Sequence, residues 1–302
     1  MRYDIVLLTS MFGMPLATAH AQTIAPAISD PAPDARYPAG LDAFVLPVRP
    51  GAMNALIYLA SGSGHHPTLL LLHGFPGNEQ NLDLAQAARR AGWNVLTMHY
   101  RGSWGSPGSF SFTHAAEDAH AALAYLRVPA IAEKYRIDTT RIAVAGHSMG
   151  GFMAANAAAD DKAVIGLFLI DPWDLSVSAA ALTKSDGPKN WHKEVADEMP
   201  PLAGTSEAAL AQELVASGRR FDLGDRIAAY GERPLAIYSA TRGIGAANLG
   251  YLQAATSAGK NQRVGALWNT DHSFSDMRIL LSAALVAWLN EIASTSSPKS
   301  AN

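Results

Sequence analysis

The chain has 302 residues, of which 49% are hydrophobic and 16% are charged, and its formal net charge is −3 at pH 7. This length suits one large domain or two small ones, and the charge gives no electrostatic reason to expect nucleic acid or an anionic membrane as a partner. The absence of Cys excludes disulfides, thiol nucleophiles and thiolate metal ligands.

The first predicted element is a secretory signal peptide over residues 1–21. A basic start precedes an apolar run that ends near Ala19, and Ala19-His20-Ala21 is a small-x-small cleavage pattern. The run is shorter than the roughly 20 residues of a membrane span. We therefore expect cleavage after Ala21, export to the periplasm or the medium, and no membrane contact of the mature protein. Residues 22–42, rich in Ala, Pro and Asp, predict a linker.

Strands alternate with helices along most of the remaining chain. The predicted strands are 44–48, 55–60, 68–73, 93–100, 141–146, 164–170, 234–239 and 264–268. The predicted helices are 79–91, with Asn78 as its cap, 113–127, 149–160, 246–258 and 276–293. Such alternation implies an α/β fold with a mostly parallel sheet and helices on both faces.

Residues 172–232 interrupt this alternation. They show helical patterns, Pro pairs and two Trp, with no convincing strand. We predict an inserted helical cap that divides the α/β core into residues 43–171 and 233–293. Residues 294–302 would form a C-terminal tail.

The strongest local motif is Gly146-His147-Ser148-Met149-Gly150, a G-x-S-x-G between a buried strand and a helix of small residues. In this context the Ser occupies a sharp, strained turn from strand to helix, and the glycines leave room for the helix to pass close to the strand. The hydroxyl would project at a helix N-terminus, whose dipole favours developing negative charge. We predict that Ser148 is a nucleophile.

A Ser hydroxyl needs a general base to become a good nucleophile. The segment NTDHSFSD follows the last predicted strand and contains His272. Among the ten His of the chain, His272 alone combines a position after a late strand with a place after the Ser in chain order. We predict that His272 is the general base.

The oxyanion that forms on attack needs two backbone N–H donors. Met149, directly after the nucleophile, would supply one, and Phe75 in the loop HGFPGN would supply the other. His73-Gly74 in this loop resembles the H-G oxyanion motif of esterases, and we expect His73 to bond to the loop backbone. His147 is expected to pack beside the nucleophile.

From about residue 43 to 293 the chain resembles an α/β-hydrolase. RIDTTRIAVAGHSMGG and HYRGSWGSPG are similar to segments of the dienelactone-hydrolase and prolyl-oligopeptidase-like branch. The resemblance implies an eight-stranded sheet whose first two strands are antiparallel, Ser148 and His272 as nucleophile and base, Phe75 and Met149 as oxyanion donors, and no cofactor. These motifs are far more specific for the fold than for the substrate.

The family pattern also implies an Asp after the seventh strand, and here the sequence departs from it. The stretch YSATRGIGAAN, Tyr238–Asn248, follows that strand and contains no carboxylate. None occurs anywhere from Arg233 to Thr270. The acid of a catalytic triad is therefore either elsewhere or missing.

Four Asp residues are candidates for this acid. Asp171 directly follows the sixth strand, where some family members place their acid, and we favour it ahead of Asp174. Asp276 fits a helix N-cap better, and Asp271 adjoins His272, so that their side chains would diverge. A site without an acid, working slowly as a Ser–His dyad, is also open.

The first functional hypothesis is an exported serine hydrolase that cleaves small-molecule carboxylic esters through an acyl-enzyme on Ser148. Trp104, Phe110 and Trp173 would line an apolar substrate pocket. The alternatives are a serine peptidase of the prolyl-oligopeptidase-like type and a non-catalytic binding protein with a degenerate site. We expect no metal or cofactor, because the sequence has no zinc-binding spacing, phosphate loop or dinucleotide fingerprint. It does not indicate an oligomeric state.

Overall fold

The computed structural model describes residues 25–48, 51–257 and 263–296. The predicted signal peptide lies outside these ranges. The strands are β1 (Gly40–Pro47), β2 (Ala52–Leu59), β3 (His66–Leu72), β4 (Asn94–Met98), β5 (Ile137–His147), β6 (Val164–Ile170), β7 (Leu235–Arg242) and β8 (Arg263–Asp271). The helices around them are α2 (Leu82–Arg90), α3 (Phe112–Leu126), α4 (Pro129–Tyr135), α5 (Met149–Asp160), α10 (Gly245–Ser257) and α11 (Arg278–Ser296).

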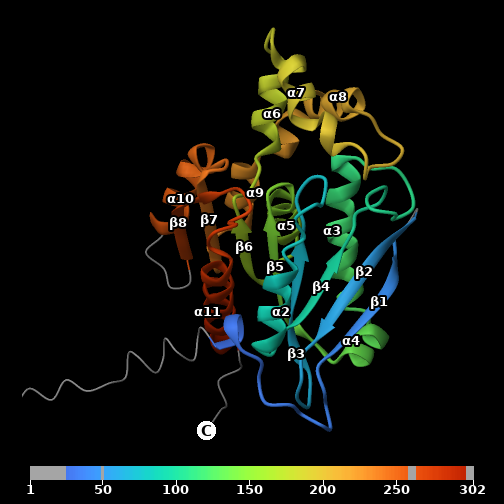
Figure 1. Ribbon diagram of the computed structural model, residues 1–302, viewed down its shortest axis with the longest axis vertical. Helices are drawn as coiled ribbons and strands as arrows, with labels where there is room; N and C mark the ends of the chain where they lie inside the picture. The colour runs from blue at the N-terminus through green and yellow to red at the C-terminus, as the bar shows by residue number, and fades with distance from the viewer. Residues whose placement is uncertain (1–24, 49–50, 258–262, 297–302) are drawn as a thin grey trace, which may run out of the picture.

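The eight strands form one sheet in the order β1-β2-β4-β3-β5-β6-β7-β8 (Figure 1). β2 pairs antiparallel with β1 and with β4, and every other neighbouring pair is parallel. The predicted α/β class, the mostly parallel eight-stranded sheet and its antiparallel first pair are therefore confirmed.

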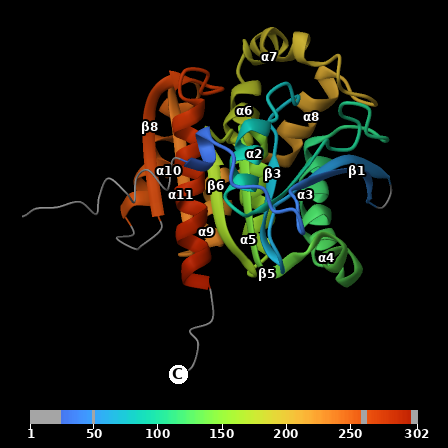
Figure 2. The same ribbon diagram turned by 60° about the horizontal axis from the view of Figure 1, so that its bottom comes forward.

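Helices cover the two faces of the sheet because alternate residues of a strand point to opposite sides. Leu70 and Leu72 of β3 belong to an apolar cluster with α3 and α5, whereas Leu69 and Leu71 belong to a second cluster with α2 and α11. Figures 1 and 2 show α2 and α11 on the same side of the sheet. Nearly continuous apolar strands such as β3 are expected when both faces are buried.

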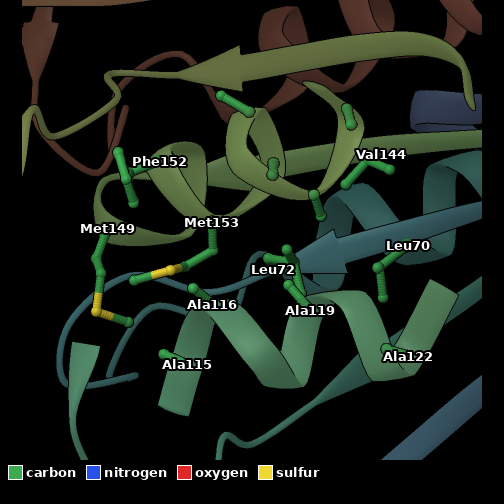
Figure 3. Packing of buried hydrophobic residues seen from close by; sticks show 14 of the residues in the cluster. Leu70, Leu72, Ala115, Ala116, Ala119, Ala122, Val144, Met149, Phe152 and Met153 are labelled. Carbon is green, nitrogen blue, oxygen red and sulfur yellow. The ribbon is translucent and has the colours of Figure 1, made fainter. Parts of the chain in front are cut away.

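The first cluster packs α5, the helix that follows the nucleophile turn, against α3. Figure 3 shows Met149 and Met153 of α5 beside the side chains of α3, where most of the contacting residues are Ala. Small side chains let two helices approach closely, and close packing keeps α5 in a fixed position. The N-terminus of α5, which follows Ser148 directly, is therefore anchored in the core.

Several predicted boundaries are wrong. α2 begins at Leu82 and its N-cap is Asn81, not Asn78. Asn81 has a left-handed backbone (φ 59°, ψ 36°), which Asn tolerates better than most residues, so the chain turns there and the helix starts late. Asn78 instead donates from its amide to Glu198 at 2.9 Å. α4 was not predicted, and its first residue is a Pro, which suits the first helical position.

The predicted linker and tail also differ from the structure at their edges. Residues 25–28 are helical. β1 starts at Gly40, inside the predicted linker 22–42, because Gly40 already pairs with Leu59 at the end of β2. α11 continues to Ser296, beyond the predicted start of the tail at residue 294.

The segment between β6 and β7 is helical throughout its regular part. It contains α6 (Leu175–Leu182), α7 (Gly187–Val195), η1 (Ala196–Glu198), α8 (Glu207–Ser217), η2 (Gly218–Phe221) and α9 (Leu223–Tyr230). Figures 1 and 2 show α6, α7 and α8 together beyond one end of the sheet. α9 differs, because it packs against α5 of the core. We call residues 175–221 the cap. None of the described helices has the length and hydrophobicity of a membrane span.

The cap is tied to the core by hydrogen bonds of the main chain. The N–H groups of Trp104 and Phe110 donate to the carbonyls of Pro201 and Ala203, both at 2.9 Å. The carboxylate of Glu213 in α8 accepts the first two N–H groups of α3, at 2.9 and 2.7 Å. A carboxylate at a helix N-terminus also complements the helix dipole, so α3 and the cap stabilise each other.

Candidate active site

Ser148 lies at the turn between β5 and α5 with backbone angles of φ 55° and ψ −123°. Residues other than Gly rarely adopt this conformation, and its free-energy cost must be offset by the surroundings. The Ser148 N–H donates to the carbonyl of Ile170 at 2.9 Å, and the Ser148 carbonyl accepts the N–H of Trp173 at 2.9 Å. The strained turn is thus fixed between the ends of β5 and β6.

The glycines around Ser148 are required by close backbone approach. A Cβ on Gly146 would lie 2.0 Å from the carbonyl oxygen of Gly150, and a Cβ on Gly150 would lie 2.3 Å from that of Leu72. A Cβ on Gly74 would lie 2.9 Å from the Cβ of Ser148. These separations are too short for any side chain. Helix α5 and the loop after β3 can therefore approach the nucleophile turn this closely only because these three positions are Gly.

Asp171, the favoured candidate for the acid, directly follows β6 and lies beside His272. Its Oδ2 accepts a hydrogen bond from Nδ1 of His272 at 2.7 Å, and Asp171 is fully buried. Because an ionised carboxylate only accepts, the His proton is on Nδ1 and Nε2 is left as the acceptor for a hydroxyl proton. The structure therefore brings together two of the predicted catalytic residues, His272 and Asp171.

The carboxylate-free stretch YSATRGIGAAN surrounds Asp171 with hydrogen-bond donors. The N–H of Ala240 donates to Oδ1 at 3.2 Å, the N–H of Ile244 to Oδ2 at 2.9 Å, and the side-chain amide of Asn248 to Oδ1 at 3.4 Å. A buried carboxylate is costly unless such donors replace water. The segment that lacks an acid therefore stabilises the acid of the neighbouring strand.

Sequence reasoning missed Asn248 and Gly243 in this loop. A Cβ on Gly243 would lie 2.1 Å from Oδ2 of Asp171 and 3.0 Å from Cα of His272, so only Gly lets the loop pass this close to both residues. The signal that was available is compositional: a stretch rich in Gly, without carboxylates, that holds one buried amide.

Asp174, the second choice for the acid, has a structural role. It is the N-cap of α6, and its carboxylate accepts the N–H of Ser176 at 3.0 Å and the N–H of Leu223 at 3.4 Å. The hydroxyl of Tyr251 also donates to it. Asp174 therefore joins α6, α9 and α10, and its bonding partners do not include His272.

The two remaining candidates also bond to groups other than His272. The carboxylate of Asp276 accepts from the Thr270 hydroxyl and pairs with Arg242 at 3.1 Å. α11 begins two residues further on, so Asp276 is not its N-cap as predicted. Asp276 instead links the loop before α11 to the ends of β8 and β7. Asp271 accepts the N–H of Ser275 at 2.8 Å, within the turn that carries the base.

Two backbone N–H groups next to the nucleophile turn have no acceptor among the described residues. Met149 is the first residue of α5, where an N–H has no intrahelical partner, and Phe75 follows Gly74, which lies against Ser148. Within the described part of the chain, neither the N–H of Phe75 nor that of Met149 donates a hydrogen bond. Both groups are free to bind an oxyanion.

His73 supports the loop that carries Phe75. Its Nδ1 donates to the carbonyl of Gly74 at 2.7 Å, and its Nε2 lies 3.3 Å from Nδ1 of His99. Burial lowers the pKa of His73 to about 4, so the ring is neutral near pH 7 and Nε2 accepts from His99. The predicted contact of His73 with the loop backbone is present.

The three aromatic residues predicted to line a pocket have different surroundings. The ring centroid of Trp173 lies 6.3 Å from that of Phe75, the residue whose N–H is a predicted oxyanion donor. Phe110 is buried and lies 5.7 Å from Phe75, so it packs behind that ring. Trp104 is 41% exposed, and its indole N–H donates to the carbonyl of Pro76 at 3.0 Å.

A separate apolar groove of about 560 Å³ lies in the cap between α7 and α8, with Trp191 and Val215 in its lining. None of its lining residues is a predicted catalytic residue. As for metal ions, residues 25–48, 51–257 and 263–296 contain no cluster of three or more His, Asp or Glu side chains suited to hold one.

The sequence matches the alpha/beta hydrolase family model over residues 69–292. This range is most of the chain, and the sheet order agrees with it. The protein belongs to the alpha/beta hydrolase family. The narrower dienelactone-hydrolase and prolyl-oligopeptidase-like branch stays a prediction. A search of curated proteins finds no match.

Several solved structures share this fold. The thermophilic carboxylesterase EstE1, cloned from a metagenomic library, has 21% identity and a TM-score of 0.55, over 93% of this chain and 96% of that one. Est1E from Butyrivibrio proteoclasticus has 18% identity and a TM-score of 0.59, over 83% and 99%. The 2,6-dihydroxy-pseudo-oxynicotine hydrolase has 14% identity and a TM-score of 0.62, over 86% and 70%. Family membership supports a hydrolase activity, and the likeness to these three structures, each at 21% identity or less, shows the shared fold.

Proposed function

We propose that the protein is an exported serine hydrolase that cleaves carboxylic esters of small molecules. The observation that carries the proposal is the 2.7 Å hydrogen bond from His272 to the buried carboxylate of Asp171. This pair lies at the same end of the sheet as Ser148, whose strained turn is the expected conformation of a nucleophile.

In the proposed reaction, Oγ of Ser148 attacks the ester carbonyl carbon while its proton passes to Nε2 of His272. The resulting oxyanion accepts hydrogen bonds from the N–H groups of Phe75 and Met149. His272 then protonates the leaving alcohol as its C–O bond breaks, and an acyl-enzyme remains on Ser148. Water, deprotonated by His272, hydrolyses it. Asp171 holds the imidazole in the required tautomer and stabilises its charged form.

Esters are favoured over peptides by the chemistry of the surroundings. A peptidase that reads a peptide N-terminus needs carboxylates free to bind an ammonium group, whereas Asp174, Asp271 and Asp276 are all engaged by protein donors. The rings of Trp173 and Phe75 offer apolar surface that suits an uncharged acyl or alcohol group.

A fluorophosphonate probe tests the nucleophile directly. We expect the wild type to be labelled and Ser148→Ala to be unlabelled, with turnover of a p-nitrophenyl ester lowered about 10⁶-fold. Ser294→Ala, which changes an exposed hydroxyl on α11, is the matched control and should behave as the wild type. Labelling that survives Ser148→Ala would refute the proposal.

The same assay separates the two alternatives. A wild type that reacts with neither the probe nor any ester would support a binding protein with a degenerate site. Turnover of a peptide panel that exceeds turnover of the ester panel would support a peptidase. We expect ester turnover to exceed peptide turnover, because amides need more stabilisation of the leaving group.

The export part of the proposal rests on the pattern of residues 1–21. Expression of the full chain in a bacterial host should place the protein in the periplasm or the medium with Gln22 as its N-terminal residue. An intact Met1 on a cytoplasmic product would contradict it. N-terminal sequencing of each cell fraction measures this outcome without any assumption about catalysis.

A further inference from the structure

His147 contacts the proposed base, although the reaction described above gives it no part. It is the last residue of β5, is 4% exposed, and immediately precedes Ser148. Its Nε2 donates to the main-chain carbonyl of His272 at 2.8 Å. The two ring centroids are 4.6 Å apart with an interplanar angle of 42°. His147 therefore touches both the backbone and the ring of His272.

The ring of His147 is neutral. Burial is the main cause that lowers its pKa to about 3, and the neighbouring His272 adds to the effect. Since a carbonyl can only accept, Nε2 carries the proton, and Nδ1 has no hydrogen-bond partner among the described groups. A Cβ on Gly74 would lie 3.4 Å from that Nδ1, so the loop of Phe75 packs along the same edge. A neutral ring places no charge beside an imidazolium.

We propose that His147 is a positioning residue that sets the place of His272 relative to Ser148. The hydrogen bond that His272 donates to Asp171 orients the imidazole through Nδ1. The hydrogen bond that His147 donates holds the backbone from which the imidazole projects. Because His147 and Ser148 are consecutive, this bond ties base to nucleophile across a single peptide link. The inference rests on the proposed function, since it concerns the same proton transfer.

Positioning and simple packing predict different tolerances at this position. If His147 only fills space, a side chain of similar volume without a donor should serve equally well. If it positions His272, the reaction rate should depend on an N–H donor at the position of Nε2 and not on the presence of a ring. A proton transfer is sensitive to such placement, because a shift of about 1 Å can lower a rate about 10²-fold.

Three substitutions separate the two roles. His147→Gln brings an amide N–H to about the reach of Nε2, His147→Asn carries the same amide one methylene shorter, and His147→Phe keeps a ring without a donor. His66→Gln is the matched control, because His66 is another buried His bonded to backbone carbonyls, at the opposite end of the sheet. For each variant we would measure the rate constant of fluorophosphonate labelling, kcat and KM for a p-nitrophenyl ester, and thermal unfolding.

We expect His147→Phe and His147→Asn to lower the labelling rate and kcat about 10²-fold with KM unchanged. His147→Gln should restore both to within about fivefold of the wild type, and the control should change neither. If the Phe variant does not fold, the comparison of Gln with Asn decides the matter. Equal rates in the Gln and Asn variants would overturn the inference alone. A wild type that is not labelled at all would overturn it together with the proposed function.

Discussion

The turns after β6 and β7 lie side by side and contribute different groups to the acid beside His272: one supplies a carboxylate, the other hydrogen-bond donors. The turn after β6 supplies a negative charge, Asp171. The segment 240–248, which runs from the end of β7 into α10 and is called the β7 turn below, contains no carboxylate. It supplies the donors of Ala240, Ile244 and Asn248. A buried acid needs both a carboxylate and groups that keep it ionised without water. The comparison shows that these two needs can be met from different strands, provided that the strands are neighbours.

The sharpest test of this division is removal of the charge from the β6 turn. We expect Asp171→Asn to lower turnover of a p-nitrophenyl ester about 10⁴-fold, because the imidazole loses the group that fixes its tautomer and stabilises its charged form. Asp174→Asn is the matched control, three residues away and of the same shape, and should stay within a few-fold of the wild type. Turnover of Asp171→Asn near that of the wild type would break the comparison.

The next test adds a single methyl group to the β7 turn. Gly243→Ala would place a Cβ 2.1 Å from the Asp171 carboxylate, so either the acid or the loop must move. We expect kcat to fall about 10²-fold, as for other small displacements of a catalytic group. Gly250→Ala, where nothing lies within 4 Å of the added atom, is the control. Equal kinetics in the two variants would show that acid and loop need not fit closely.

A third test asks whether the other carboxylate of the β6 turn serves stability alone. Asp174→Ala removes the acceptor shared by Ser176, Leu223 and Tyr251. We expect the free energy of unfolding in urea to fall by about 2 kcal/mol, because buried donors lose their partner. Ester turnover by the folded protein should change little. A loss of turnover comparable to that of Asp171→Asn would mean that both carboxylates serve the reaction.

The smallest effect is expected for the side-chain donor of the β7 turn. The bond from Asn248 to Asp171 is long, at 3.4 Å, and long hydrogen bonds are weak. The N–H groups of Ala240 and Ile244 remain when it is lost. We expect Asn248→Ala to lower kcat only a few-fold, measured beside Gly250→Ala on the same helix. A loss as large as that of Gly243→Ala would show that the amide, not the backbone, is the main donor.

The fold was predictable because its signals are local and repeated. Apolar strands of the right length alternate with helices, and the sheet contains all eight predicted strands. The start of α2 was not predictable, because it depends on the left-handed backbone of Asn81. α9 belongs by sequence to the helical insertion, yet it packs on α5, which only the chain path reveals.

The candidate site was predictable where a motif carries it and ambiguous elsewhere. Ser148 and His272 follow from the strand-turn-helix pattern and chain order. Asp171 and Asp174 are only three residues apart, and the choice depends on a backbone detail, since Asp171 has φ 39° whereas Asp174 caps a helix. The donors around Asp171 are mainly backbone N–H groups, which every residue but Pro possesses, so no sequence pattern marks them.

The hydrogen bonds between the cap and the loop that contains Trp104 have a consequence for how molecules reach Ser148. The cap shares main-chain hydrogen bonds with the core and holds the N-terminus of α3 through Glu213, so it could swing away from the core only by breaking these bonds. The entrance to Ser148 would then keep a constant size, so bulky esters would be excluded and the cap would not close around the esters that enter. Esters would then be selected by size as they enter the site. Small and large esters would differ more in kcat/KM than in kcat.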